Sequence, residues 1–180
     1  MEAARAVFAE YGYAQASMRD IAKAAGISVG GLYLYFKNKE ELYRSFSREW
    51  MQNLNDRTQE ALVNIEDPAA SLSEYIRVSI DFARKNREMI VLQGREKGFA
   101  CGDEQKRAFF ASRRELIADI IDKGIDNGVF APCDTEEAAK VIFNLLRGFI
   151  VSMLIDEEAL FAPDACVDLV LNGLLRRDNG

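Results

Sequence analysis

The sequence lacks histidine altogether and contains only three cysteines among its 180 residues. Without histidine there is no Ser–His or Cys–His pair for nucleophilic catalysis and no imidazole ligand for a metal. Cys101, Cys133 and Cys166 are too widely spaced for a zinc site or a redox pair. We therefore expect free thiols, no catalytic residues, no metal and no cofactor, and a chain that is not an enzyme. Cys101, which lies among glycines, is the one thiol that we consider as a redox sensor.

Long apolar runs are also missing. The longest extends from Val141 to Ile155 and includes Asn144 and Arg147, which makes it too short and too polar to cross a membrane. The N-terminus shows no basic patch followed by the apolar core of a secretion signal. The sequence therefore predicts a cytoplasmic protein without a membrane partner.

Proline is scarce, and no stretch alternates apolar and polar residues as strands do. Apolar residues instead recur at helical spacing, which predicts an all-α chain with a three-helix domain over residues 1–46 and a helical domain over residues 47–180. Gly12 should end a first helix whose inward residues are Ala3, Ala4, Val7, Phe8 and Tyr11. The remaining helices are expected at about residues 18–25, 29–36, 40–61, 71–86, 104–127, 135–155 and 163–177, with a loop around the glycines at 94, 98 and 102.

One run, from Ser17 to Leu42, reads SMRDIAKAAGISVGGLYLYFKNKEEL and predicts two short helices joined by a glycine turn. Ser17 and Asp20 have the spacing of a capping box, which starts a helix near Met18. Gly26 is expected to end this helix in a left-handed turn. Its inward face should consist of Ile21, Ala22 and Ala25.

The second helix of this run is expected to begin with Ser28 as its cap, after Ile27 has filled the corner between the helices. Its inward side chains would be Leu32 and Phe36. Its outer surface would include Ser28, Val29, Gly31, Tyr33, Leu34 and Tyr35. This order of helix, glycine turn and helix is that of a helix-turn-helix, whose second helix enters the major groove of DNA.

These residues also carry a resemblance to the tetracycline-repressor (TetR) family of bacterial transcriptional regulators. The residues that match its N-terminal signature are Ser17, Ile21-Ala22, Ala25-Gly26-Ile27-Ser28, Gly30, Leu32-Tyr33, Tyr35-Phe36, Lys39-Glu40 and Leu42. The resemblance implies phosphate-backbone contacts from Ser17, Tyr33, Tyr35 and Lys39, to which we add Arg19. It implies base-edge contacts from Ser28, Val29, Gly30 and Gly31. An alternative for the two tyrosines is that they pack the domain.

The resemblance further implies a ligand-responsive regulator, most simply a repressor, that binds a palindromic operator in double-stranded DNA as a homodimer and leaves it when a small-molecule effector binds. It also implies a longer N-terminal arm, so that an arm is missing here or the start is misplaced. A second interpretation is a helical dimeric interaction protein whose DNA-binding head is degenerate.

The expected recognition helix carries few groups that could read bases. From Ile27 to Phe36 there is no Arg, Lys, Asn, Gln, Asp or Glu, so no bidentate bond to a base is available. Gly30 and Gly31 each cost about 1 kcal/mol relative to alanine in a helix, and they allow the backbone to approach the groove closely. We therefore hypothesise that specificity depends on DNA shape and on half-site spacing.

Charge is divided unevenly along the chain. Residues 1–48 have a net charge of +2, and the remaining 132 residues have a net charge of −8. Because the chain as a whole is acidic, attraction to phosphate must come from local lysines and arginines, and DNA binding should weaken steeply with salt. The alternative is ordinary surface variation.

The two C-terminal helices are too apolar to be covered by one neighbour each, which indicates a subunit interface. The residues concerned are Val141, Ile142, Leu145, Leu146, Phe149, Ile150 and Met153, followed by Cys166, Val167, Leu169, Val170, Leu171, Leu174 and Leu175. The resemblance implies the same assignment, a homodimer in which two helices from each subunit form a four-helix bundle. The alternative is an ordinary monomeric core.

An effector cavity is expected in the second domain. The candidate ligand-binding residues are Trp50, Tyr75, Phe82, Met89, Gln93, Phe109, Arg113, Phe143 and Arg147. The apolar members of this set could equally be core residues. Arg113 and Arg147 are stronger candidates because they occur on largely apolar helices, and burial of either would favour an anionic or carbonyl-bearing ligand.

Overall fold

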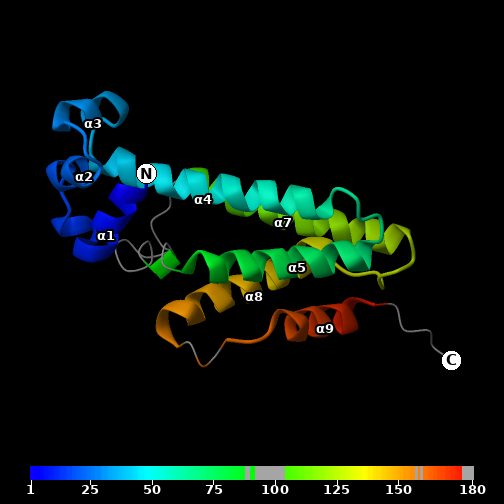
Figure 1. Cartoon of the computed structure of the whole chain (residues 1–180). Helices are drawn as coiled ribbons and strands as arrows, with labels where there is room; N and C mark the ends of the chain where they lie inside the picture. Colours follow the sequence, from blue (N-terminus) through cyan, green and yellow to red (C-terminus); the bar gives the residue numbers. More distant parts are fainter. Residues whose placement is uncertain (88–89, 92–103, 157, 159, 176–180) are drawn as a thin grey trace. The chain divides into compact units, whose positions relative to one another are not determined.

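The structure is a computed structural model that describes residues 1–87, 90–91, 104–156, 158 and 160–175 (Figure 1). Within these residues it contains eight helices with defined bounds and no strand, which confirms the all-α prediction. The helices are α1 (Glu2–Gln15), α2 (Met18–Ala24), α3 (Val29–Tyr35), α4 (Lys39–Leu62), α5 (Pro68–Lys85), α7 (Glu104–Asp126), α8 (Thr135–Ile155) and α9 (Pro163–Leu174).

The described residues form two compact units that divide within α4. The first unit contains Met1–Asn53 with the later residues 87 and 90–91, and the second contains Leu54–Asn86 and the described residues from Glu104 onward. The functional boundary between residues 46 and 47 remains a prediction. It falls inside α4, so that one continuous helix would belong to both expected domains.

The first unit is built from α1, α2, α3 and the start of α4 around the ring of Phe8. Phe8 is fully buried and meets Tyr43 and Phe46 edge-on, with ring centroids 5.4 and 5.8 Å away. Tyr11, which we expected to face inward, is 50% exposed. Gly12, with a φ of 71°, interrupts the helix immediately after Tyr11, which accounts for this exposure. One further helical turn then follows and ends at Gln15.

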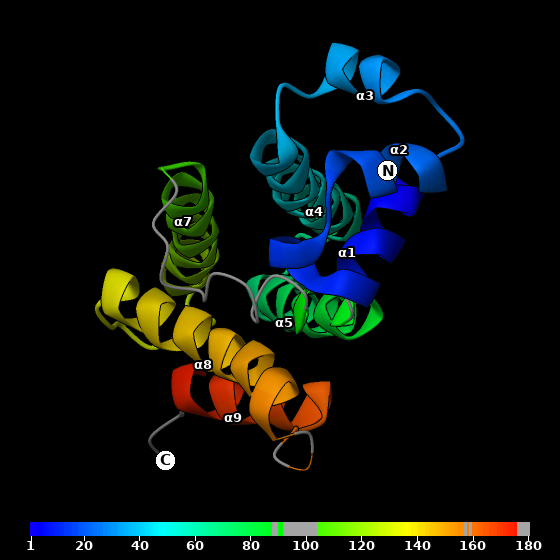
Figure 2. The same ribbon diagram turned by 90° about the vertical axis from the view of Figure 1, so that its left-hand side faces the viewer.

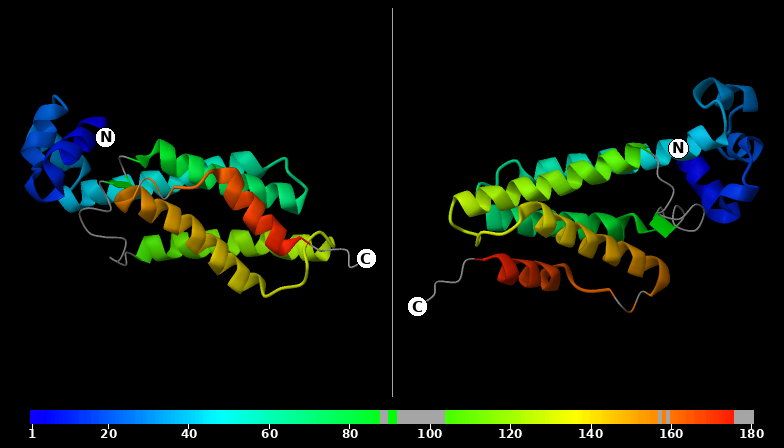
Figure 3. Two further views of the ribbon diagram at one scale, coloured as in Figure 1. Left: turned by 90° about the horizontal axis from the view of Figure 1, so that it is seen from below. Right: turned by 180° about the vertical axis from the view of Figure 1, so that it is seen from behind.

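The second unit is arranged around α5, which packs against α7, α8 and α9 (Figures 2 and 3). Its core includes fully or nearly fully buried Leu72, Tyr75, Ile76, Ile80, Ile117, Ile121 and Phe149. The start of α5 differs from the prediction, which placed it at Ser71. Asp67 accepts a hydrogen bond from the backbone N–H of Ala70, and Pro68 occupies the first turn, so that the helix begins three residues earlier.

The connection from α7 to α8 is fixed by a glycine contact. Gly124, in the last turn of α7, lies so close to the buried ring of Phe130 that a Cβ on this glycine would overlap the ring. The N–H groups of Val129 and Phe130 both donate to the carbonyl of Gly124, at 2.8 and 3.0 Å. Gly128 has a φ of 72° and ends the helix, as expected. Asp134 then caps α8 by accepting from the N–H of Glu137.

None of the helices that the structure describes combines the length and the apolar character needed to cross a membrane.

Candidate DNA-binding and ligand-binding sites

The first helix of the predicted motif, α2, is fixed at both ends. At its start Ser17 Oγ accepts from the N–H of Asp20, and the Asp20 carboxylate accepts from the N–H of Ser17, both at 3.2 Å. This confirms the predicted capping box. At its end Gly26 has a φ of 67° and donates to Lys23, while Ile27 donates to the carbonyl of Ala22. These two bonds are those of a Schellman motif, which confirms the left-handed turn.

The corner between the helices is filled differently from the prediction. Ile27, which we expected to fill it, is 45% exposed, and Ala25 is exposed as well. Both flank Gly26, where the chain has left the last turn of α2, so neither faces the core. Leu32 of α3 is 5% exposed and takes this place beside Ile21 and Ala22.

The second helix, α3, presents a surface that its caps hold in place. Ser28 Oγ accepts from the N–H of Gly31 at 3.0 Å, as predicted. Val29 is 36% exposed, Tyr33 50% and Tyr35 77%, and a Cβ added at Gly30 would meet no atom within 4 Å. The exposure of the tyrosines contradicts the alternative that they pack the domain.

Leu34 belongs to the same surface and was not among the predicted contact residues. It is 86% exposed, more than any other large apolar side chain that the structure describes. The spacing already placed it on the outer surface, because Leu34 lies one helical turn after Gly30 and on the opposite side from inward-facing Leu32, but no DNA contact was assigned to it. Arg19 of α2 is also exposed, together with Lys23 and Lys37.

Lys39, a predicted phosphate contact, has its ammonium group engaged within the first unit. Its Nζ donates to the carbonyl oxygens of Tyr13, Ala14 and Ala16 at 2.5, 3.1 and 2.8 Å, and it lies 4.5 Å from the centre of the Tyr13 ring. These carbonyls are at the end of α1, where a helix leaves its last acceptors unpaired and attracts a cation. The phosphate contact remains a prediction, whereas the structure assigns these donors to α1.

Arg113 is the predicted ligand residue with the most unusual surroundings. It is 3% exposed, and its guanidinium donates from Nε to Tyr75 Oη at 3.1 Å, from Nη1 to Thr58 Oγ1 at 3.1 Å and from Nη2 to Ser79 Oγ at 3.5 Å. All three acceptors are hydroxyls. In the part of the chain that the structure describes, no carboxylate forms an ion pair with this arginine.

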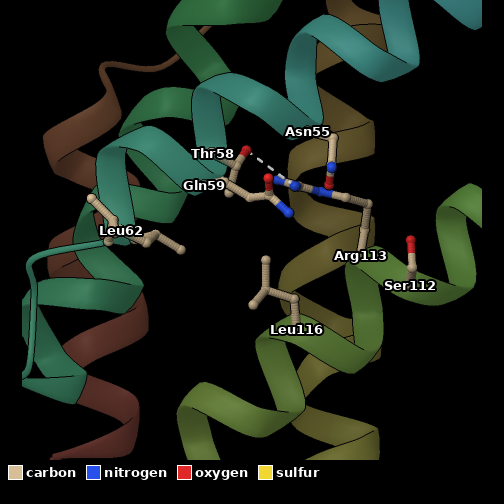
Figure 4. Close-up of a pocket in the computed structure, with 8 residues that line it drawn as sticks. Asn55, Thr58, Gln59, Leu62, Ser112, Arg113 and Leu116 are labelled. Carbon is tan, nitrogen blue, oxygen red and sulfur yellow. Dashed lines mark hydrogen bonds between the residues drawn. The ribbon is translucent and has the colours of Figure 1, made fainter.

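A cavity of about 390 Å³ adjoins this arginine, between α4 and α7 (Figure 4). Its lining consists of Asn55, Thr58, Gln59, Leu62, Val63, Ser112, Arg113 and Leu116. Figure 4 shows Arg113 reaching from α7 toward Thr58 of α4. Of the seven predicted ligand residues that the structure describes, Arg113 alone lines this cavity.

The other predicted ligand residues lie elsewhere. Arg147 is half-buried and stacks over Phe110 and Phe143, at 5.2 and 5.9 Å from the ring centres, and Phe109 adjoins Phe110. Phe82 is buried under the guanidinium of Arg57, Trp50 belongs to the first unit, and Met89 and Gln93 fall outside the described residues. The predicted set is therefore divided, because aromatic side chains on different helix faces pack in separate clusters.

The two cysteines within the described residues are free, as expected. Burial raises the pKa of the Cys166 thiol to about 11. Cys133 is exposed, and partial burial together with Asp134 and Asp122 raises the pKa of its thiol as well. Cys101 lies outside the described residues. Both described thiols are therefore protonated near neutral pH and poorly suited to redox sensing.

Two capped helices, a glycine turn and an exposed second helix define a helix-turn-helix DNA-binding protein. The model of the family "Bacterial regulatory proteins, tetR family" matches residues 1–46. YfiR of Bacillus subtilis, an uncharacterized HTH-type transcriptional regulator, is 29% identical over 171 residues, which cover 88% of this chain and 80% of YfiR. The HTH-type transcriptional repressor KstR2 of Mycolicibacterium smegmatis is 28% identical over 137 residues, covering 73% of this chain and 66% of KstR2.

A solved structure agrees with these relatives along almost the whole chain. The TetR family transcriptional regulator PfmR from Thermus thermophilus has a TM-score of 0.73 at 27% identity, covering 97% of this chain and 98% of PfmR. Residues 1–46 thus match the TetR family of bacterial transcriptional regulators, and the chain as a whole is similar to regulators of that family; it is a DNA-binding regulator.

Proposed function

We propose that this protein is a repressor that binds a palindromic operator as a homodimer and that a small-molecule effector releases it. The observation that carries the proposal is α3, whose exposed face is held by the Ser28 cap and by Leu32 in the core. The relative KstR2 is named a repressor, which supports repression rather than activation. Because the protein acts on the chromosome in this proposal, it would work in the cytoplasm, and by binding rather than by catalysis.

The DNA contacts that we propose divide into two groups. Ser17, Arg19, Tyr33 and Tyr35 would hold the phosphate backbone and set the register of α3. Ser28, Val29, Gly30 and Gly31 would face the bases, where their sparse chemistry favours recognition of groove shape and half-site spacing. A homodimer would place two copies of α3 about 34 Å apart, one helical turn of DNA.

The dimer interface that we propose is the outer face of α8 and α9. Val141 and Ile155 of α8 are 65% and 79% exposed, and Leu169 of α9 is 67% exposed. Gly148 and Gly173 lie on the same helices, and a Cβ at either would meet nothing within 4 Å, so both leave room for a partner helix. Exposed apolar side chains around small residues are typical of a surface that a second subunit covers.

The main experiment measures binding of the full chain to the DNA upstream of its own gene, by mobility shift over a range of salt concentrations. We expect specific binding whose logarithm falls linearly with the logarithm of salt concentration. Gly30→Asp should weaken it at least tenfold, because a carboxylate would face phosphate and bases while the open position leaves α3 undisturbed. Ala70→Asp, which adds the same charge at an exposed position of α5, is the matched control and should bind normally.

The dimer is tested by light scattering with Gly148→Arg. We expect wild type and Gly30→Asp to have twice the mass of one chain, and Gly148→Arg to have the mass of one chain and weaker operator binding. A wild-type protein that dimerises but binds no DNA specifically would instead favour the degenerate-head interpretation, which the comparisons with known regulators do not favour.

A further inference from the structure

We propose that Arg113 binds the carboxylate of an amphipathic small molecule in the cavity between α4 and α7. This inference rests on the proposed function, because it names the chemical class of the effector. It starts from a guanidinium that is almost completely buried, at 3% exposure, and whose described partners are all neutral.

Among the residues that the structure describes, no opposite charge compensates that of Arg113. A buried charge is costly unless an opposite charge faces it, and hydroxyl groups provide only part of that compensation. Tyr75 does not provide the missing charge, because burial raises the pKa of its phenol above the ordinary value and keeps it neutral. Its ring, 4.5 Å from the guanidinium carbon, adds a cation–π contact.

Arg113 also has donors to spare. A guanidinium carries five N–H groups in a planar fork that matches the two oxygens of a carboxylate. Its three described hydrogen bonds use one donor on each nitrogen, and the bond to Ser79 is at the 3.5 Å limit. These described bonds leave one N–H on each of the two terminal nitrogens, which suits a carboxylate.

The cavity has the polarity that an amphipathic carboxylate requires. Its lining contains no acidic residue, and Asn55, Gln59 and Ser112 add neutral polar groups beside Arg113. Leu62 and Leu116 also line a second cavity of about 390 Å³. The rest of its lining consists of apolar Ile65, Pro68 and Ile120 together with Glu66, Ser71 and Lys123. The two cavities thus share an apolar wall along which a hydrocarbon tail would lie.

One positive charge in the first cavity favours a monoanion. A phosphate monoester carries close to two negative charges near neutral pH, and the lining offers no second cation beside Arg113. A carboxylate carries one negative charge, which a single guanidinium neutralises.

The position of Arg113 connects occupancy of the cavity with regulation. Its hydrogen bonds join α7 to Thr58 of α4 and to Tyr75 and Ser79 of α5. A carboxylate bound to the two remaining N–H groups would draw the guanidinium toward the cavity, weaken its bond to Thr58 and so change how α4 is held. Because α4 is one helix from Lys39 to Leu62, such a change acts on the element that directly follows the DNA-binding motif. Effector and operator would then each stabilise a different conformation of α4 and so shift the equilibrium between them in opposite directions.

The experiment measures binding of octanoate, decanoate and 4-phenylbutyrate to the full chain by calorimetry, with octan-1-ol and decan-1-ol as uncharged analogues. We expect saturable binding of at least one carboxylate, at least tenfold tighter than its alcohol. Arg113→Met should weaken the carboxylate at least tenfold and leave the alcohol unchanged, and Arg113→Lys should restore part of the difference. Arg114→Met is the matched control, because Arg114 stacks on Phe143 and does not line the cavity.

Two results would overturn the proposal: none of the carboxylates binds wild type, or Arg113→Met binds them as wild type does. If Arg113→Met fails to fold, the comparison of carboxylate with alcohol in wild type and in Arg113→Lys decides alone. The mobility shift keeps this test separate from the proposed function. Specific DNA binding without carboxylate binding refutes only the effector class, and carboxylate binding that requires Arg113 without DNA binding refutes only the repressor.

Discussion

Lys39 provides the sharpest test of how the DNA-binding unit is held together, because its ammonium group has two competing assignments. The structure directs its three donors to the carbonyls of Tyr13, Ala14 and Ala16, whereas the family resemblance assigns it to DNA phosphate. Lys39→Met removes the charge and retains most of the apolar stem. The two assignments then predict opposite outcomes for stability.

The magnitude follows from the three hydrogen bonds. A bond to a charged group contributes roughly 1.5 to 3 kcal/mol when buried. Lys39 is half-buried and its three bonds share one charge, so we take the loss to be about 2 to 3 kcal/mol in total. This corresponds to amide hydrogen exchange in α1 and α2 that is faster by roughly 30- to 150-fold, since 1.4 kcal/mol is tenfold.

The assay combines hydrogen exchange with the salt dependence of operator binding. Lys37→Met is the control, because Lys37 is an exposed cation on the same segment, and its backbone bond to Glu41 is retained. We expect Lys39→Met to accelerate exchange in α1 and α2, and Lys37→Met to leave it unchanged. Unchanged exchange in Lys39→Met, together with a salt slope that is shallower by about 0.9, would show that Lys39 is a phosphate ligand and refute the structural assignment.

Three further predictions concern glycine geometry and thiol chemistry. Gly124→Ala should lower the free energy of unfolding by at least about 2 kcal/mol in thermal denaturation, because Phe130 is 1% exposed and cannot move aside. Gly30→Ala is the control and should be neutral or stabilising. Equal melting temperatures for the two variants would contradict this prediction. Gly26→Ala should cost about 1 to 2 kcal/mol, because only the left-handed backbone and no clash opposes the methyl group, and a neutral result would show that the turn can rearrange. Cys166 should react with an aromatic disulfide reagent at pH 8 only after unfolding, and rapid reaction of the native thiol would contradict its burial. The contribution of this thiol to the free energy of unfolding should be complete below pH 9 and decline as the pH rises toward about 11.

The DNA-binding unit was predictable because its signals are local. The Ser17 and Ser28 caps and the Gly26 turn each depend on a few neighbouring residues, and all three are confirmed. The prediction that Ile27 fills the corner was wrong, because the sequence indicates that an apolar residue fills it but does not indicate which one. The earlier start of α5 had a local signal, the Asp67–Pro68 pair, which apolar periodicity alone does not use.

The ligand site was predictable only in part, because it depends on packing between distant helices. The rarity of arginine on an apolar helix identified Arg113, and its burial satisfies the condition stated for an anionic ligand. Arg147 occurs in the same sequence setting, yet it stacks on Phe110 and Phe143 and is half-buried. Composition cannot distinguish an arginine that packs on aromatic rings from one that faces hydroxyls, since that depends on which helices meet.

The empty space at Gly30 has a consequence for how this regulator could acquire new target genes. A Cβ added there meets no atom within 4 Å, and alanine would make α3 more stable by about 1 kcal/mol. A single substitution to glutamine or arginine would therefore introduce a base-reading group at no cost to the fold. In this protein a route to a new operator is thus the addition of one side chain, without the loss of a contact within the fold.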